Sequence, residues 1–180
     1  MASPPLWHTV RMPQSSDLVI REASAADAAA VAAIYNEYVL TTAISFEIDP
    51  VGSEAMTARI AEVAERGHPW LVAELTGRVV GFAYATHFHH RAAYCRTVET
   101  TIYLAPSATG QGVGKVLYQD LLSRVHALGF HTAVATIALP NDASVGFHES
   151  FGFTAVGRLP EVGRKLGRWI DLGYWHLMLD

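Results

Sequence analysis

The sequence predicts a single mixed α/β domain whose regular elements follow the order βααβββαβαββ. Its 180 residues fall within the roughly 100 to 200 expected of one compact domain. Apolar residues make up 51% of the chain and charged residues 17%, a balance that supplies a buried core and excludes a disordered protein. Runs rich in β-formers alternate with segments of helical periodicity, which is typical of a layered fold that contains both.

The first elements are a short strand and two helices. Residues 18–21 form a β-rich run, and the apolar residues of 25–40 recur every three or four positions behind Ser24, which suits an N-cap. A second helical pattern begins at Ser53 and stops at Gly67. We therefore expect two consecutive helices after the first strand.

Three strands follow these helices. Residues 70–75 and 79–87 are β-rich and are separated by Thr76-Gly77-Arg78, the signal of a hairpin turn, so they should pair antiparallel. Residues 97–104 fit a half-buried strand, and Pro106 ends it.

The remaining elements complete the order. They are a helix over 113–128, a strand over 132–139, a short helix through His148, and β-rich stretches over 153–159 and 169–179 around a glycine- and base-rich hairpin. Residues 18–180 are thus expected to form the domain. Residues 1–17, with several prolines and serines and no apolar core segment, are interpreted as a loose leader and not as a secretion signal.

Charge and cysteine content exclude several classes of protein. Thirteen Lys and Arg against 17 Asp and Glu leave a net charge of −4, which argues against a general affinity for nucleic acid or anionic lipid. The longest apolar run, 28–35, is far shorter than the roughly 18 residues of a membrane span. Because Cys95 is the only cysteine, an intrachain disulfide and a cysteine-rich zinc site are excluded, and a reducing cytoplasm fits best.

A glycine-rich loop lies directly after the 97–104 strand and before a helix. Its sequence is Thr109-Gly110-Gln111-Gly112-Val113-Gly114-Lys115. Glycines in that context let backbone N–H groups converge on an anion at the helix N-terminus, although the glycines alone predict a simple tight turn equally well. A P-loop is excluded because Val116 follows Lys115, and the third glycine is one residue too close for a dinucleotide fingerprint.

With its surroundings, this loop resembles the acetyl-CoA loop of the GNAT N-acetyltransferase superfamily. Gly112 and Gly114 match the glycines of that motif, whereas Thr109 stands where the family usually has Arg or Gln. Asn141, followed by a helix that ends in Gly152-Phe153, resembles the second family motif. Four further stretches, 34–36, 69–74, 138–142 and 167–171, resemble the subfamily that acetylates phosphinothricin, methionine sulfoximine and methionine sulfone. The resemblance extends from residue 19 to residue 179.

The resemblance implies a GNAT fold, a homodimer, and acetyl-CoA as co-substrate. The residues that the resemblance implies in binding acetyl-CoA are Ile102, Tyr103, Leu104, Gly110, Gln111, Gly112, Val113, Gly114, Lys115, Asn141 and Ser150. Of these, Asn141 is expected to bond the pantetheine amides, with Ser144 as a helix cap. A backbone N–H near 102–104 is the expected donor to the carbonyl oxyanion.

Two side chains are candidates for proton transfer. Glu99 shares a strand face with Thr97, Thr101 and Tyr103, and a carboxylate there suits a general base that acts directly or through water. The alternative is a salt-bridged structural glutamate. The resembled subfamily has its proposed base at this position. His148 lies where many family members carry a tyrosine that protonates the thiolate, and its alternative is a packed helix histidine.

Recognition of an amino acid analogue calls for arginines near the site. Arg91, Arg96, Arg164 and Arg168 lie in two loops that are expected to flank it. The expected substrate-binding residues are Phe46, Ala92, Ala93, Tyr94 and Arg96, with Glu47 as a further lining residue. Trp169 and Tyr174 fit either a pocket wall or the core, and the core is favoured. His87, His89 and His90 lack a nearby Asp, Glu or Cys at ligand spacing, so no metal is expected.

The leading hypothesis is a cytoplasmic N-acetyltransferase that uses acetyl-CoA and acts on the α-amino group of a small amino acid analogue. One alternative keeps the fold but changes the acceptor to a polyamine, an aminoglycoside or a protein N-terminus. Another is a non-catalytic acyl-CoA-binding module, which would not need Glu99.

Overall fold

The computed structural model describes residues 17–179, so the leader expected over 1–17 lies almost wholly outside the described residues. The helices are α1 (Ala28–Thr41), α2 (Ser53–Glu65), α3 (Val113–Ala127) and α4 (Asp142–Glu149). The strands are β1 (Leu18–Glu22), β2 (Trp70–Leu75), β3 (Arg78–His87), β4 (Thr97–Leu104), β5 (Thr132–Leu139), β6 (Thr154–Lys165) and β7 (Arg168–Met178). This order matches the expected βααβββαβαββ. No helix in the described part of the chain is long and apolar enough to cross a membrane.

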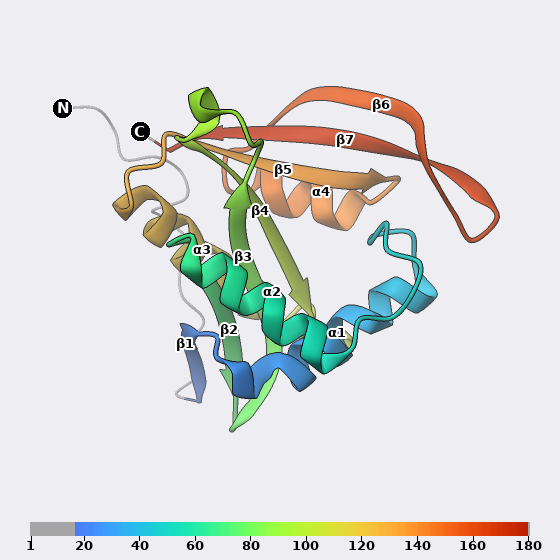
Figure 1. Cartoon of the computed structure of the whole chain (residues 1–180). Coiled ribbons are helices and arrows are strands. Elements are labelled where there is room, and N and C mark those ends of the chain that lie inside the picture. The colour runs from blue at the N-terminus through green and yellow to red at the C-terminus, as the bar shows by residue number, and fades with distance from the viewer. Residues whose placement is uncertain (1–16, 180) are drawn as a thin grey trace.

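The strands form one seven-stranded sheet in the order β1-β2-β3-β4-β5-β7-β6. All neighbours are antiparallel except β4 and β5, which run parallel and pair only from Thr97–Glu99 to Thr132–Val134. Beyond Glu99 the two strands separate (Figure 1). The sheet therefore opens along its middle, and the end of β4 has a backbone edge without a strand partner.

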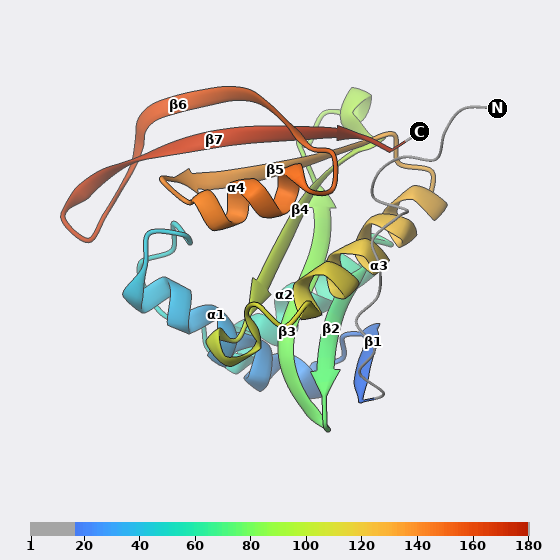
Figure 2. The same ribbon diagram turned by 180° about the vertical axis from the view of Figure 1, so that it is seen from behind.

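Helices cover both faces of the sheet, as strand alternation requires. On β2, Leu71 and Ala73 pack with the core that includes α3, whereas Trp70 and Val72 pack with α1 and α2. Figure 1 shows α1 and α2 in front of β2–β4, and the reverse view in Figure 2 brings α3 to the front. The face of β4 that carries Glu99 is the one toward α1 and α2, because Thr100 on the opposite face bonds to α3.

The core around α3 centres on Tyr118, whose side chain is fully buried. Its ring contacts the aromatic rings that α4 and the following turn supply, including Phe147, Phe151 and Phe153. The phenol oxygen lies 2.7 Å from the Thr100 hydroxyl oxygen. Burial raises the pKa of Tyr118, so this hydroxyl stays neutral and ties β4 to α3.

The start of α1 is fixed by a buried carboxylate. A turn of 3-10 helix, Ala25–Asp27, precedes α1, and the Asp27 side chain accepts hydrogen bonds from the Ser24 backbone N–H at 2.8 Å and hydroxyl at 2.9 Å. Arg21 of β1 donates to both oxygens of the same carboxylate at 2.7 and 2.8 Å. Ser24 is thus the N-cap of the 3-10 turn that precedes α1, whereas Asp27 is the N-cap of α1 itself and accepts the hydrogen bonds.

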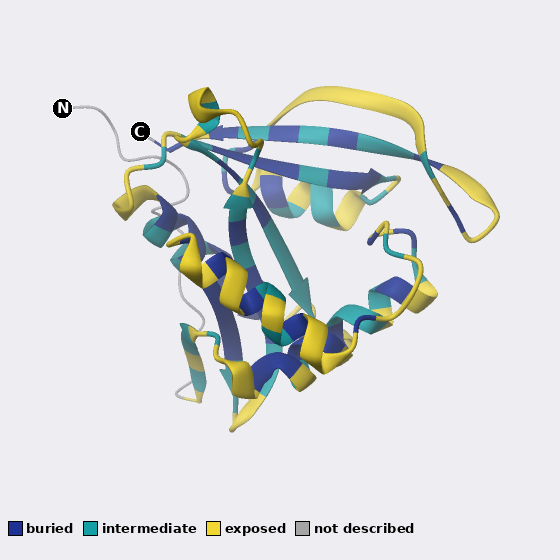
Figure 3. Cartoon of the chain, viewed as in Figure 1, coloured by how far each residue is buried: buried dark blue, intermediate teal, exposed yellow. Residues whose placement is uncertain are grey.

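The last two strands form an arm that is longer than expected. β6 continues to Lys165 instead of ending at residue 159, because two register shifts, at Ala155/Gly157 and Leu159/Gly163, let it stay paired with β7. Figure 3 shows β6 exposed over most of its length. Trp169 was expected in the core, and this is wrong: it is 57% exposed near the tip of the arm, where the Arg164 guanidinium lies 5.6 Å from its ring. Tyr174, closer to the body, is half-buried.

Candidate active site

A cavity of about 460 Å³, the central cavity, lies where β4 and β5 separate. Residues 100–103 of β4, Thr136 and Ala138 of β5, Ser144 and His148 of α4, and 44–47 of the loop after α1 line it, together with Tyr35, Tyr84 and Leu172. The cavity thus adjoins the unpaired end of β4, where backbone groups are available to a ligand.

Glu99 is the last residue of β4 to pair with β5, so it stands at the point where the strands part. Its Oε1 accepts a hydrogen bond of 2.6 Å from the hydroxyl of Thr136, which lines the central cavity. Glu99 is absent from the ion pairs that the structure records for residues 17–179, so the reading as a salt-bridged structural glutamate finds no support. The hydrogen bond recorded for its carboxylate comes from a hydroxyl and not from a cation.

His148 lines the central cavity but is 5% exposed and is surrounded by aromatic rings. Its Nδ1 lies 2.8 Å from the backbone oxygen of Ser144. Because a carbonyl oxygen only accepts, Nδ1 carries the proton, and Nε2 of the neutral ring is an acceptor without a proton. Burial lowers the pKa of His148, which disfavours the doubly protonated ring. This geometry favours the packed histidine over the general acid.

The glycine-rich loop follows a turn of 3-10 helix, Pro106–Ala108, that comes after β4, and it leads into α3. Gly112 is the N-cap of α3 with φ +82°, and Gly110 has φ +75°, so both adopt the left-handed region that glycine alone enters easily. Gly114 allows a close approach, since a Cβ there would lie 3.0 Å from the Leu104 side chain. The loop, the first turn of α3 and the free end of β4 therefore lie together. Unpaired N–H groups at a helix start fit an anion such as pyrophosphate.

The other residues expected to bind cofactor lie in this loop, in the first turn of α3 and at the two ends of α4. Gln111 is tied back by a 2.6 Å hydrogen bond from its side chain to the Ser107 carbonyl. Asn141 caps α4 by accepting from the Ser144 backbone N–H at 3.2 Å, so Asn141, and not Ser144, is the cap. Ser150 is exposed and donates to the Phe147 carbonyl. Val113 is buried in the first turn of α3, and Lys115 is exposed there.

Of the residues expected to bind substrate, one lies at the central cavity and the others lie elsewhere in the fold. Phe46 lines the central cavity, as expected. Ala92, Ala93 and Tyr94 form a separate turn, and Tyr94 lines another hollow, beside β6 and β7. Arg96 hydrogen-bonds the Gly129 carbonyl after α3. The structure therefore does not bring these four residues to the central cavity of the chain.

The sequence does not predict two basic side chains that lie near the central cavity. Arg59 of α2 forms a forked ion pair with Glu47, with N–O distances of 2.6 and 3.2 Å. Lys165, at the end of β6, is buried and donates to the Ser45 carbonyl at 2.7 Å. Phe46 lies against Gly163 of the same arm, where a Cβ would be 2.5 Å from its ring. The arm thus holds the loop that forms one cavity wall, a contact between residues 120 positions apart that no local pattern signals.

Comparison with known proteins identifies the family. Residues 20–173 match the family model described as an acetyltransferase (GNAT) domain. The chain belongs to the GNAT acetyltransferase family. The phosphinothricin N-acetyltransferase of Streptomyces viridochromogenes is 42% identical over 91% of this GNAT chain and 88% of its own. An L-methionine sulfoximine/L-methionine sulfone acetyltransferase of Pseudomonas aeruginosa is 38% identical over 89% and 94%.

Solved structures agree with the GNAT assignment. A GNAT phosphinothricin acetyltransferase from Sinorhizobium meliloti, solved in complex with acetyl-CoA, has a TM-score of 0.86 and 36% identity over 90% of this chain and 88% of that one. The fold expected from the sequence is therefore confirmed. Within residues 17–179, no three His, Cys, Asp or Glu side chains gather as a candidate metal site in this GNAT protein.

Proposed function

We propose that this protein transfers the acetyl group of acetyl-CoA to the α-amino group of a small amino acid analogue such as phosphinothricin, methionine sulfoximine or methionine sulfone. The observation that carries the proposal is the placement of Glu99. Its carboxylate stands at the separation of β4 and β5, bonded to Thr136 and beside a cavity with an unpaired strand edge. The names of the relatives support the choice of acceptor.

In this arrangement the acetyl group passes directly from the thioester to the acceptor amine. Glu99 takes a proton from the ammonium of the acceptor, directly or through water, and the amine nitrogen attacks the thioester carbonyl carbon. Backbone N–H groups of residues 102–104 stabilise the oxyanion. The C–S bond of the tetrahedral intermediate then breaks, and the sulfur leaves as a thiolate, which with a thiol pKa near 8.5 needs no obligatory acid. The second proton of the attacking nitrogen passes to this thiolate or to water, which leaves the neutral amide and free CoA. His148 accordingly packs the cavity wall and donates no proton in this scheme.

The glycine-rich loop and β4 hold the co-substrate in this proposal. The backbone of residues 110–115 binds the pyrophosphate at the start of α3, and residues 102–104 bond the pantetheine amides. Asn141 and Ser150 contact the pantetheine chain of acetyl-CoA from the side of α4. Among the expected substrate residues, we keep Phe46 and leave out 92–94 and Arg96, which lie elsewhere in the fold.

We also propose that the protein is a cytoplasmic homodimer. The arm exposes apolar side chains that a monomer would leave in water, namely Val156, Leu159, Val162, Leu166 and Trp169. β6 is moreover a long edge strand. Light scattering after size exclusion should give twice the chain mass, and V162D should lower it. A monomeric wild type would refute the dimer.

The experiment that tests the function compares Glu99→Gln with the wild type. Free thiol release from acetyl-CoA at pH 8 should fall by about two to four orders of magnitude, while acetyl-CoA binding by calorimetry stays unchanged. Glu65→Gln, an exposed change at the end of α2, is the matched control and should keep full activity. Unchanged turnover in E99Q would reject the base.

The acceptor is tested with a panel of the three amino acid analogues, spermidine, an aminoglycoside and a peptide. Activity restricted to the analogues supports the proposal. Activity on another amine would keep the fold and change the acceptor. Acetyl-CoA binding without turnover on any amine would favour a non-catalytic module.

A further inference from the structure

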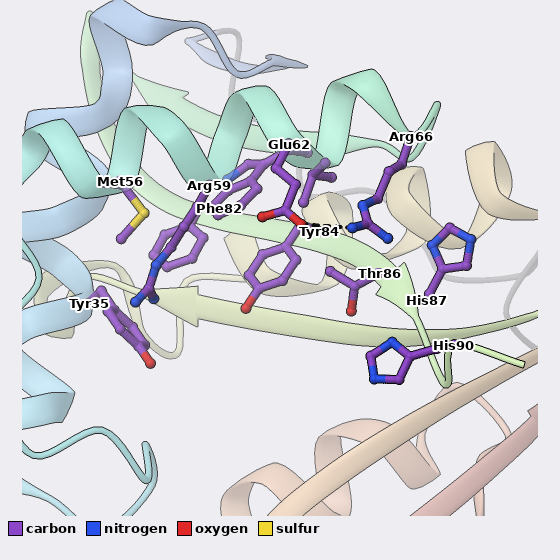
Figure 4. Close-up of a pocket in the computed structure, with 12 residues that line it drawn as sticks. Tyr35, Met56, Arg59, Glu62, Arg66, Phe82, Tyr84, Thr86, His87 and His90 are labelled. Carbon is purple, nitrogen blue, oxygen red and sulfur yellow. Dashed lines mark hydrogen bonds and ion pairs between the residues drawn. The ribbon is translucent and has the colours of Figure 1, made fainter.

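A second cavity, the α2 cavity, lies between α2 and β3 and has a volume of about 300 Å³ (Figure 4). One part of its wall is apolar and aromatic: Met56 and Val63 of α2 face Trp70, Phe82 and Tyr84 of β2 and β3. The other part is polar and includes Glu62, Arg66, His87 and His90, of which Glu62 and Arg66 pair with each other at 2.9 Å. Tyr35 and Tyr84 line both this cavity and the central cavity, so the two adjoin. Thr86 also lines it and is the β3 partner of Glu99. The α2 cavity therefore opens beside the proposed base.

A fixed guanidinium stands at the junction of the two cavities. In Figure 4 the Arg59 side chain reaches down from α2 between the rings of Tyr35 and Tyr84. Glu47 holds it with two hydrogen bonds, and Tyr35 donates to the same carboxylate at 3.2 Å. An arginine has five N–H donors, so three remain for a ligand in a planar, preset geometry. Glu47 raises the pKa of Arg59, which keeps its charge at any working pH.

The wall of the α2 cavity also holds an unsatisfied donor. Trp70 is 4% exposed, and its indole Nε1 has no hydrogen-bond partner among the described residues. Buried N–H groups are nearly always bonded, so this indole is a donor for an oxygen, of water or of a ligand, that enters the cavity. The apolar wall, the Arg59 guanidinium and the indole donor together suit a short apolar stem that ends in an oxygen-bearing group.

Resting on the proposed function, we infer that the α2 cavity receives the side chain of the acceptor and that Arg59 selects side chains with an anionic end. The amine then lies near Glu99, the methylene groups contact the aromatic walls, and the terminal oxygens meet Arg59 and Trp70. Phosphinothricin carries an anionic phosphinate at this end, whereas methionine sulfone carries a neutral sulfone. Arg59 is therefore a specificity-determining residue that favours the first over the second.

The test measures kcat and KM of Arg59→Met for both acceptors. A hydrogen bond to a charged group contributes about 1.5 to 3 kcal/mol, so kcat/KM for phosphinothricin should fall roughly 10- to 150-fold, mainly through KM. For methionine sulfone the loss should stay under about threefold. Arg59→Lys should recover part of the phosphinothricin activity because the charge returns without the fork. Trp70→Phe should lower kcat/KM for both acceptors, because it removes a donor that either oxygen can use.

Arg124→Met is the matched control. Arg124 is also in ion pairs, with Asp120 and Glu22, but on α3, away from both cavities. It should leave the ratio of the two kcat/KM values unchanged. Equal losses for both acceptors in R59M would overturn the inference, since they would mean that Arg59 supports the fold or binds the shared α-carboxylate. A wild type that acetylates neither acceptor would instead reject the proposed function, and the subsite with it.

Discussion

The carboxylate of Asp27 gives the sharpest stability prediction. Asp27 is 5% exposed and accepts four hydrogen bonds, two from Arg21 and two from Ser24. Chiefly through Arg21, these lower the pKa of Asp27 from 3.8 to about 2. A shift of nearly two units corresponds to about 2 kcal/mol of folding free energy at pH 7. Asp27→Asn should therefore lower the free energy of unfolding by about that amount.

The sign of the pH dependence follows from the direction of the shift. The stabilisation is complete above the unfolded pKa of 3.8 and is lost as the pH falls through the folded value of about 2. Urea unfolding followed by circular dichroism at pH 7, 5 and 3 should give a difference between wild type and variant that is constant down to pH 5 and reduced to about half at pH 3. Asp120→Asn, which breaks a more exposed ion pair with Arg124, should cost under about 1 kcal/mol. A D27N cost no larger than that of D120N, or one that does not shrink between pH 5 and 3, would refute the reasoning.

Three further changes test other contacts. Gly112→Ala forces a side chain into the left-handed N-cap of α3, so it should cost about 1 kcal/mol in thermal or urea unfolding and raise KM for acetyl-CoA. Tyr118→Phe removes the hydrogen bond to the Thr100 hydroxyl, which retains a contact to a backbone carbonyl. The free energy of unfolding measured in urea should therefore fall by about 1 kcal/mol. His148→Phe should keep kcat within about tenfold of wild type and leave the alkaline limb of the pH–rate profile in place. A fall in kcat of two or more orders of magnitude, with disappearance of that limb, would instead assign His148 as the general acid.

Most of the fold could be predicted from local signals. The strands 70–75, 97–104 and 132–139 have the expected bounds because turns, glycines or a proline stand at their ends. β6 is the exception: its second half carries no periodic pattern, since it is exposed and owes its conformation to pairing with β7. Trp169 misleads for the same reason, because an aromatic residue near the tip of an arm has no core to enter.

The residues of the site also differ in how far local sequence patterns predict their positions. Glu99 and the glycine-rich loop are continuous with strongly patterned elements, so the sequence already indicates their place. Arg59 and Glu47 lie on different elements, and only tertiary packing joins them. Arg96 misleads because the direction of its side chain depends on the Gly129 carbonyl, far along the chain.

The contact between Lys165 and the Ser45 carbonyl bears on how the acceptor specificity of such an enzyme could change. Lengthening or reshaping the turn at Leu166 and Gly167 would move Lys165 and Gly163, and through them the loop that carries Phe46 and Glu47. Because Glu47 pairs with Arg59, such a change would reach the junction of the two cavities from a distance. We therefore expect libraries that vary this remote turn to alter acceptor choice without enlarging the cavity walls.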